Sequence, residues 1–485
     1  MVTLRPLLLK ETRARRWDGG ALVLLLTFVA LLPLFTPRLY ATDSVQYYVY
    51  LRSLFFDGDL DFSNDYARFN QLNPDAGIQR GLLDPDKHEP LTGRPLNVAP
   101  IGSALLWTPV FLLAHGGVLL AQQLGSPVTA DGFSPPYIWA VCLASALYGL
   151  LGILLCYRIA RRYASARAAT AATLGCWLAS PLVFYMYVSP PWSHTAGLFA
   201  TALFIWYWLD SGPQRTLRQW LLLGVIGGLM VLTREQLGLF LLLPAVEALA
   251  QYIADLRLGR WAAIGRRLGG HMLFLLALAL TWLPQLFAYH AVNGRWGPSR
   301  IVAQKFDVRS PHALATLIDV GPSPVTGLPL AHGALLWTPI WALGLLGLLL
   351  LLRRQGWLAL LLLLTFAAQV WINGSFLTWH LSGAFGFRRL IEATPLFVLG
   401  VAALIDGVRL PRSVWALIGA ALIIWNVGLI GQWTVTNTAL RRGLIWDGML
   451  RQQLNVPAQV GQKLEQILFD RCALVKNCAS ETPAR

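Results

Sequence analysis

The sequence predicts an all-α protein that crosses a membrane about eleven times, and three observations support this fold class. Of the 485 residues, 56% are hydrophobic and only 13% are charged, whereas about 25% of the residues of a soluble domain are charged. The mean hydropathy is +0.54. Apolar runs recur along the whole chain, and a bilayer span needs about 20 such residues. The twelve runs are 20–36, 100–123, 137–158, 168–188, 193–210, 219–233, 236–254, 270–290, 333–352, 356–373, 390–408 and 412–433.

The net charge of +15 reflects how the chain is oriented in the membrane rather than a nucleic-acid partner. Arginines gather in short connections between apolar runs, which is the positive-inside pattern and not a basic binding face. The basic stretch 1–17 precedes the first run without a small-residue cleavage site, so we expect an uncleaved first helix and a cytoplasmic N-terminus. Short loops and the lack of sorting signals favour a bacterial plasma (inner) membrane. The arginines that mark the inner connections are Arg158, Arg161, Arg162, Arg167, Arg215, Arg218, Arg257, Arg260, Arg266, Arg267, Arg353, Arg354, Arg409 and Arg412.

One apolar run, 100–123, does not fit the alternation of inner and outer loops. It contains Pro100, Pro109 and the pair Gly116-Gly117, which break or weaken a helix. We interpret it as a juxtamembrane or re-entrant element, which leaves eleven spans. A straight crossing at this place is the alternative, and the range is 11–13 spans.

The resulting topology divides the chain into a transmembrane module, 1–433, and an extracytoplasmic tail, 434–485. Cys472 and Cys478 lie in this tail and would form a disulfide in an oxidising compartment; two free thiols fit the spacing equally well. The other cysteines, Cys142, Cys156 and Cys176, lie within apolar runs and are predicted to be packing residues.

Two long loops, 37–99 and 292–332, are predicted on the outer side, and loops of this length are usually functional or disordered. Three aspartates in the first loop occupy every second position of a short stretch. Their oxygens suit Mg²⁺ or Mn²⁺, but a turn with helix-capping aspartates explains the same pattern. These weak candidates for a metal site are Asp57, Asp59 and Asp61.

Asp43 follows the first apolar run directly, in the stretch Ala41-Thr42-Asp43-Ser44-Val45-Gln46-Tyr47-Tyr48. A carboxylate at the mouth of a span is costly and usually functional. Asp43 is therefore the candidate catalytic residue, and Tyr47 is a candidate for substrate binding.

Further polar residues fall at the same outer face. They include Ser193-His194, Thr233-Arg234-Glu235 and the stretch from Trp379-His380 to Arg388-Arg389. An arginine pair on the outer side opposes the positive-inside trend, and a phosphate ligand explains it because guanidinium groups bind phosphate bidentately. The predicted substrate- and lipid-phosphate-binding residues are Arg388, Arg389, Arg234, Glu235, His194, His380 and Tyr47.

Each of these residues also has a structural interpretation. Arg388 and Arg389 would be anchors that flank a span, and Arg234-Glu235 would be a buried ion pair. His194, His332 and His380 would each be satisfied interfacial histidines. Glu392 is four residues after Arg388 and three after Arg389, so on an α-helix it would pair with these arginines.

The chain resembles the GT-C superfamily of membrane glycosyltransferases, which includes protein O-mannosyltransferases, aminoarabinose transferases of lipid A and oligosaccharyltransferase catalytic subunits. The matching features are one span, an acidic residue that opens a large outer loop, a second outer loop late in the chain and an apolar remainder. Asp43 occupies the position of the catalytic acidic residue. Thr233-Arg234-Glu235 lies where the aminoarabinose-type enzymes carry a cationic motif, and Gly386-Phe387-Arg388-Arg389 looks like an arginine segment of bacterial relatives.

The resemblance implies a polyprenyl-phosphate sugar donor, an acceptor hydroxyl on a lipid, glycan or protein, and inversion with Asp43 as the general base. The chain departs from the family at Ser44, where O-mannosyltransferases have a second acid, and it lacks a WWD-type motif and an acidic motif near Ser193-His194. These departures argue against protein N-glycosylation and leave a divalent cation, Mg²⁺ or Mn²⁺, as an open possibility.

Two other function classes fit the composition. A transporter or flippase of lipid-linked sugars would carry charges or helix breaks deep within its spans and inverted repeats, whereas here the polar residues gather at one face. A non-catalytic subunit of an envelope assembly would use its outer loops to bind partners, and an assay of transfer distinguishes it from an enzyme.

Overall fold

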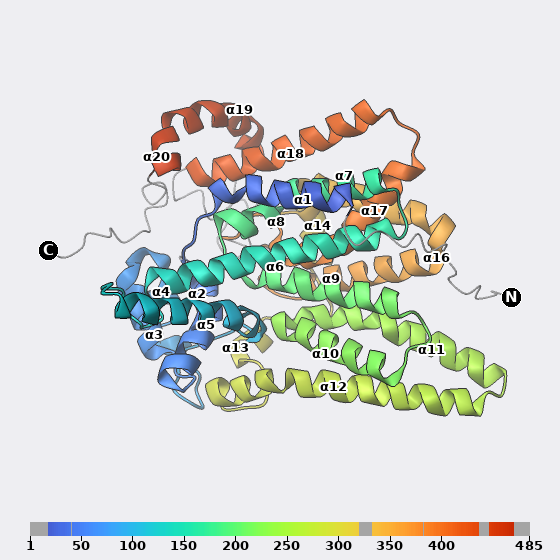
Figure 1. The fold of residues 1–485 in the computed structure, drawn as a ribbon, viewed down its shortest axis with the longest axis horizontal. Coiled ribbons are helices and arrows are strands. Elements are labelled where there is room, and N and C mark those ends of the chain that lie inside the picture. Colours follow the sequence, from blue (N-terminus) through green and yellow to red (C-terminus); the bar gives the residue numbers. More distant parts are fainter. Residues whose placement is uncertain (1–17, 40, 320–331, 382, 436–445, 470–485) are drawn as a thin grey trace.

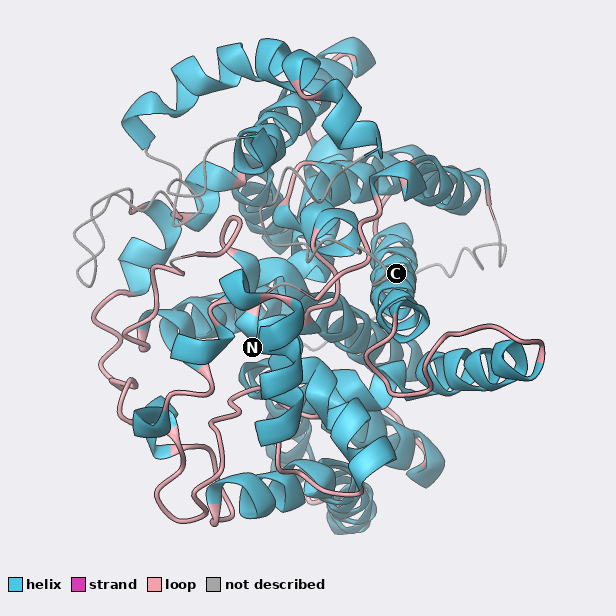
Figure 2. Ribbon diagram, turned by 90° about the vertical axis from the view of Figure 1, so that its left-hand side faces the viewer, coloured by secondary structure: helices cyan, strands magenta, loops and turns pink. Residues whose placement is uncertain are grey.

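The computed structural model describes residues 18–39, 41–319, 332–381, 383–435 and 446–469. Within these ranges the secondary structure is helical, and the only β-type pairing is an isolated bridge between Phe306 and Phe376. Figure 1 shows long helices side by side, with α2 to α5 gathered at one end. Figure 2 looks onto this end and shows several helices end-on, with long loops in front of them. The predicted all-α fold class is confirmed.

All twelve apolar runs are helical, although several are divided into two elements. The main helices are α1 (Gly19–Ala30), α2 (Thr42–Arg52), α3 (Ser63–Leu72), α5 (Gly102–Gln123), α6 (Pro135–Arg161), α7 (Ala166–Leu178), α9 (Ser193–Ser211), α10 (Leu217–Thr233), α11 (Leu242–Arg257), α12 (Trp261–Asn293), α16 (Pro339–Gly374), α17 (Thr394–Gly407) and α18 (Arg412–Val435). Short 3₁₀ helices precede α11 (η6, Glu235–Leu241) and α17 (η7, Arg388–Ala393).

The exact number of spans is not confirmed as eleven. Seven helices of the described residues are long and apolar enough to cross a membrane, or eight if α7 and the segment 181–188, which meet at 64°, form one bent span. The apolar helices Gly19–Leu34 and Leu217–Thr233 are shorter, and α16 counts once in this number although two apolar runs lie within it.

The long helix α16 is a hairpin of two legs. Its 36 residues contain one non-helical residue, Gln355, with φ −134° and ψ 52°. Both ends pack near α14 (Ala313–Ile318), since the amide of His312 donates to Gly374 and the amide of Gly333 donates to Asp319. The chain therefore reverses next to Arg353 and Arg354, as the separate runs 333–352 and 356–373 predict.

The run 100–123 is one continuous helix, α5, with Pro109 inside it, so the proline does not break the helix. Its predicted position, at the membrane face or across the membrane, stays a prediction. Pro109 is the eighth residue of α5 and removes one hydrogen bond within the helix, but the helix continues to Gln123. Gly116 and Gly117 face open space, because a Cβ atom added at either position would have no neighbouring heavy atom within 4 Å. The helix is long and apolar enough to cross a membrane. It lies at the same end of the bundle as α2 to α4 in Figure 1.

The arginine-rich connections lie at the end of the bundle opposite α2 to α5. Figure 1 shows the turns between α6 and α7, α11 and α12, and α17 and α18 at that end. Acidic side chains pair with several of their arginines. The ion pairs are Arg161–Asp18 at 3.3 Å, Arg215–Glu247 at 2.8 Å, Arg267–Asp255 at 2.8 Å and the close pair Arg162–Asp210.

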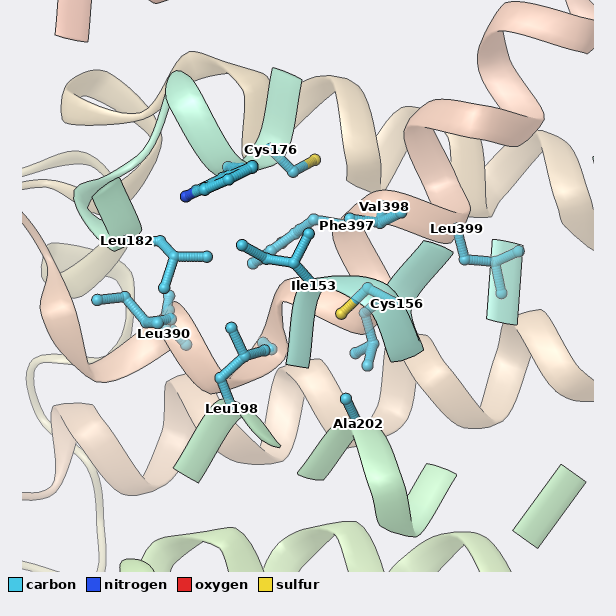
Figure 3. Close-up of a cluster of buried hydrophobic side chains, with 14 of the residues drawn as sticks. Ile153, Cys156, Cys176, Leu182, Leu198, Ala202, Leu390, Phe397, Val398 and Leu399 are labelled. Atoms are coloured by element: carbon cyan, nitrogen blue, oxygen red, sulfur yellow. The ribbon is translucent and has the colours of Figure 1, made fainter. Parts of the chain in front are cut away.

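The main core is formed by α6, α7, α9 and α17, whose buried apolar side chains interdigitate in Figure 3. Cys156 and Cys176 are fully buried within it, and Cys142 is buried as well, so all three are packing residues as predicted. Glycines let α16 and α17 approach closely. A Cβ at Gly400 would lie 1.9 Å from the carbonyl oxygen of Gly344, which no side chain can accommodate.

The first loop, 37–99, folds into helices and has its own core. Aromatic side chains of α2 and α3 pack against α5 and the start of α6; for example, Tyr48 lies against Phe69 and Phe111. This second core supports α2, the helix that carries Asp43.

Asp65 of α3 is fully buried in this loop, with Arg52 3.4 Å away. Burial raises its pKa to about 7, against the opposing effect of Arg52. The folded carboxyl therefore keeps a proton that the unfolded chain releases near pH 3.8. The contribution of Asp65 to the free energy of unfolding falls as the pH rises from about 4 to about 7, and it stays at the lower value above pH 7.

We expect the melting temperature of the Asp65→Asn variant to fall less than that of the wild type between about pH 5 and about pH 8, because the amide stays neutral. Thermal unfolding of the purified protein in detergent measures this. Asp86→Asn is the control, because Asp86 is exposed in the same loop and should keep the wild-type slope. Equal slopes for Asp65→Asn and the wild type would contradict the prediction.

The described part of the tail 434–485 consists of α19 (Trp446–Gln462) and α20 (Leu464–Phe469). The side chains of Gln453 and Lys463 donate to the backbone of α18 at Trp425 and Val435, both at 3.1 Å. Cys472 and Cys478 lie outside the described residues, and their disulfide stays a prediction.

Candidate active site

Asp43 lies in the first turn of α2, at the end of the bundle away from the arginine-rich connections. The helix starts here because Ser44 caps it. The Ser44 hydroxyl donates to the carbonyl of Ala41 at 2.8 Å and accepts from the amide of Ala41 at 3.3 Å. A carboxylate in the first turn is favoured by the helix dipole. Ser44 thus has a capping role at the position where some GT-C enzymes have a second acid.

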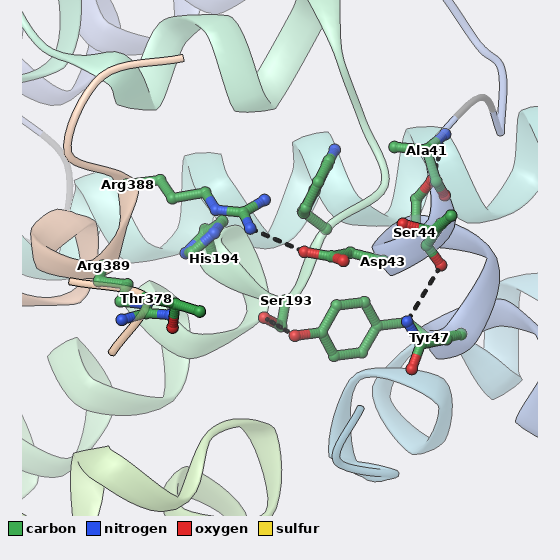
Figure 4. Close-up of polar contacts among 12 residues, drawn as sticks. Ala41, Asp43, Ser44, Tyr47, Ser193, His194, Thr378, Arg388 and Arg389 are labelled. Carbon is green, nitrogen blue, oxygen red and sulfur yellow. Dashed lines mark hydrogen bonds and ion pairs between the residues drawn. The ribbon is translucent and has the colours of Figure 1, made fainter. Parts of the chain in front are cut away.

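The Asp43 carboxylate pairs with Arg388, with 2.7 Å between Oδ2 and Nη2 (Figure 4). The Asp43 side chain is 40% exposed, whereas that of Arg388 is only 16% exposed. The guanidinium lies over the Trp192 ring, 4.2 Å from its centroid, and its Nη1 atom is buried with no hydrogen-bond partner among the described residues. Arg388 therefore orients the carboxylate and keeps a donor for a ligand.

Arg389 is the second arginine of the site. Its Nη2 donates to the Thr378 hydroxyl at 2.9 Å, and its guanidinium lies 5.8 Å from the centroid of Phe376. Its Nη1, like that of Arg388, is buried without a partner in the described part of the chain. No carboxylate there forms an ion pair with it, so its charge is available to an anion.

The interpretation that Glu392 pairs with Arg388 and Arg389 is wrong. Residues 388–393 form the 3₁₀ helix η7, in which Glu392 is rotated by about 120° from Arg388 but lies on the same side as Arg389. Tertiary contacts therefore decide the partners of Glu392. Glu392 instead accepts from His194 Nδ1 at 3.0 Å and lies 3.2 Å from Arg234 Nε. Gly197 of α9 makes room for it, since a Cβ there would lie 2.9 Å from Glu392 Cγ.

Arg234 joins this buried pair to the site. Its Nη1 donates to Ser193 Oγ at 3.1 Å. The Ser193 hydroxyl donates to Tyr47 Oη at 2.9 Å (Figure 4). Tyr47 lies on α2, the helix of Asp43. His194 is 1% exposed and contacts Glu392 and Arg234, which agrees with its structural interpretation; its role in substrate binding stays a prediction.

Glu235 does not converge with the arginines, and it is not paired with Arg234. At the start of η6 the two neighbouring side chains diverge, and the Glu235 carboxylate accepts a close hydrogen bond from Tyr289. The predicted Arg234–Glu235 ion pair is therefore wrong, whereas the role of Glu235 in substrate binding stays a prediction.

The histidines of the second half of the chain lie beside the site. Burial, Arg389 and His312 together lower the pKa of His380, so His380 is near Arg389. His332 Nε2 donates to Ala384 O at 2.8 Å, and the ring stacks on Trp337. Burial lowers the pKa of His332 to about 4, so this histidine is neutral and structural.

The aspartates of the first loop serve local turns. Asp57 binds Arg52 and Asn64, Asp59 accepts from Ser53 at 2.9 Å, and Asp61 accepts from the Ser63 hydroxyl at 2.7 Å. Among the residues that the structure describes, no group of three or more His, Cys, Asp or Glu side chains is placed to hold a metal ion. The capping interpretation of these aspartates fits their contacts.

Sequence reasoning placed Ser193 at the outer face, but it did not predict Ser193, Trp192 or Thr378 as contacts of the site arginines. Trp192 follows Pro190-Pro191 between two apolar runs, and an aromatic ring there is a partner for a cation on the same face. That signal was available, but which arginine it serves depends on the fold.

Comparisons with known proteins agree with the resemblance found in the sequence. Residues 135–282, which run from the start of α6 into α12, match the family described as Dolichyl-phosphate-mannose-protein mannosyltransferase. Ser193, His194 and Arg234 lie within the match, whereas Asp43, Arg388 and Arg389 lie outside it. No curated protein matches the chain.

Among solved structures, the chain is similar to ArnT from Cupriavidus metallidurans in the apo state, with a TM-score of 0.49 and 17% sequence identity over 94% of this chain and 75% of that chain. The family match over residues 135–282 agrees with the predicted resemblance to membrane glycosyltransferases.

Proposed function

We propose that this enzyme transfers a sugar from a polyprenyl-phosphate donor to an acceptor hydroxyl at the outer face of the inner membrane. The observation that carries the proposal is the 2.7 Å contact between Asp43 and Arg388, next to Arg389 with its unpartnered buried Nη1. One carboxylate beside two arginines provides a base for a hydroxyl and donors for a phosphate.

The charge balance of the site supports a phosphate ligand. Arg234, Arg388 and Arg389 face the carboxylates of Asp43 and Glu392, which leaves a surplus of positive charge. Buried charges are normally paired. A sugar phosphodiester carries the single negative charge that would match this surplus.

The proposed reaction uses these residues as follows. Asp43 takes the proton of the acceptor hydroxyl while its oxygen attacks the anomeric carbon. The bond from this carbon to the phosphate oxygen breaks on the opposite side, the phosphate leaves with the electron pair, and the configuration inverts. Arg388 and Arg389 stabilise the charge that develops on the phosphate.

The proposed orientation rests on the distribution of arginines. The arginine-rich connections lie at the end of the bundle opposite α2 (Figure 1), and such connections are normally cytoplasmic. The site then faces outward, with the N-terminus inside and the tail from Thr434 outside.

We further propose that phosphate binding depends on the arginines and not on a divalent cation. The side chains that converge at the site are mainly guanidinium groups, and the carboxylates of Asp43 and Glu392 are engaged with arginines. Hard cations such as Mg²⁺ and Mn²⁺ prefer several oxygen ligands, so this donor set does not fit them.

The test is incubation of the purified protein in detergent with a panel of radiolabelled polyprenyl-phosphate sugars, with and without a mixed acceptor extract of lipids, glycans and proteins. We expect one donor to be hydrolysed or its sugar transferred, with an inverted anomeric configuration in the product, and we expect EDTA to leave the rate unchanged. A protein that moves such donors across vesicle membranes without cleaving any would instead be a transporter.

A loss of activity in EDTA that Mg²⁺ or Mn²⁺ restores would contradict the arginine-only assignment and leave the donor class intact. Membranes from cells that lack the protein provide the background rate. The same assay supports the kinetic comparisons below.

A further inference from the structure

Tyr47 is placed to contact the same ligand as Asp43. It follows Asp43 by four residues on α2, so the two side chains share one face of the helix. Its phenol is within electrostatic reach of both Arg388 and Arg389, and the residue is 8% exposed. The hydroxyl therefore lies beside the arginines that carry the proposed phosphate site.

The hydrogen bonds around Tyr47 have a fixed direction. A guanidinium group donates and cannot accept, so Arg234 makes Ser193 an acceptor at 3.1 Å. The Ser193 hydroxyl in turn donates its hydrogen bond to Tyr47 Oη at 2.9 Å. Tyr47 is thus an acceptor from the protein, and none of the residues described accepts the hydrogen of its hydroxyl.

Arg234, the first donor in this series of hydrogen bonds, is itself held in place. Arg234 Nε lies 3.2 Å from the Glu392 carboxylate, which also binds His194. Glu392 and His194 are each 1% exposed, so the arrangement cannot relax toward water. A buried chain of this kind keeps Tyr47 oriented before any substrate arrives, which is the condition for electrostatic preorganisation.

We infer that Tyr47 donates a hydrogen bond to a non-bridging oxygen of the departing phosphate. This inference rests on the proposed function. When the bond between the anomeric carbon and the phosphate oxygen breaks, the phosphate gains a negative charge, so a donor at this place binds the transition state more tightly than the ground state. Tyr47 keeps its proton, and the proton of the acceptor goes to Asp43.

The first test is Tyr47→Phe, which removes only the hydroxyl. We expect kcat to fall about a hundredfold, as for the loss of one preorganised donor, with the KM for the acceptor unchanged. Tyr50→Phe is the matched control on the same helix, because the Tyr50 hydroxyl donates to Ala99 at 3.1 Å and is already used by the protein; its kcat should stay near that of the wild type.

A second measurement separates a donor from a merely structural hydroxyl. Replacement of Tyr47 by 3-fluorotyrosine gives a more acidic hydroxyl of nearly the same size. Below the pH at which it ionises, we expect kcat to rise by about twofold, as a Brønsted relation predicts for a stronger donor. An unchanged kcat, or a Tyr47→Phe variant as active as the wild type, would overturn the inference.

The two levels of the proposal fail in different ways. If the wild type cleaves no lipid-phosphate sugar, the proposed function fails and the inference fails with it. If the wild type is active, Asp43→Asn is inactive and Tyr47→Phe keeps its kcat, then only the role of Tyr47 is refuted.

Discussion

Asp43→Asn is expected to lower kcat by about a thousandfold, within the range for the loss of a general base. The amide has nearly the shape of the carboxylate, and its oxygen can still accept from Arg388 Nη2, which now lies 2.7 Å from Asp43. The variant therefore keeps the geometry of the ion pair and loses only the basic group. Initial rates of sugar transfer from the donor found in the panel measure the effect.

The matched control is Asp307→Asn. Asp307 pairs with Arg309 at 2.8 Å in the second outer loop, so this variant removes the charge of another Asp–Arg pair of similar length outside the site. Its kcat should be that of the wild type. Transfer by Asp43→Asn at a similar rate would show that Asp43 only holds Arg388 in position, and the assignment of the base would be wrong.

The main residues of the site could be predicted because each is anomalous for its place in the sequence. Asp43 is a charge at the mouth of a span, and Arg388-Arg389 is a cationic pair on the side where cations are rare. The alternation of inner and outer loops placed them at one face. The structure brings Asp43 and Arg388 together although 345 residues separate them.

The pairing within the site could not be predicted, because it depends on local helix geometry. Glu392 was assigned to its neighbours in the sequence on the assumption of an α-helix. The segment is the 3₁₀ helix η7, which separates Glu392 from Arg388, and the buried contacts with Arg234 and His194 hold its carboxylate instead. Arg234 and Glu235 are adjacent in sequence, yet their partners lie on η7 and on α12. Side-chain directions at the junction of two helices are set by tertiary packing.

The fold was predicted at the level of its apolar runs and less well in how they join. All twelve runs are helical, but Pro109 does not break α5, and two runs meet in the hairpin of α16. Hydropathy shows where a helix can lie in a membrane. It does not show whether a proline within that helix is tolerated by the helices around it.

Arg389→Ala is expected to lower kcat/KM for the donor by about a hundredfold or more, because it removes a charged donor from the developing phosphate. We also expect the melting temperature of the variant to equal or exceed that of the wild type. Arg389 has a buried Nη1 without a partner in the described structure, and removal of a buried cation that lacks a carboxylate relieves a desolvation cost. Loss of activity without loss of stability is the signature of a residue kept for function.

Two further variants test whether the charge, the shape or the location of Arg389 matters. Arg389→Lys restores the charge but not the planar fork that binds phosphate at two points, so it should regain only part of the activity. Arg309→Ala removes an arginine whose side chain is 84% exposed, and it should change neither activity nor melting temperature. If Arg389→Ala melts well below the wild type, Arg389 supports the fold. If the variant stays active, the phosphate must depend on Arg388 and Arg234, whose contacts with Asp43 and Glu392 would then have to open when the donor binds.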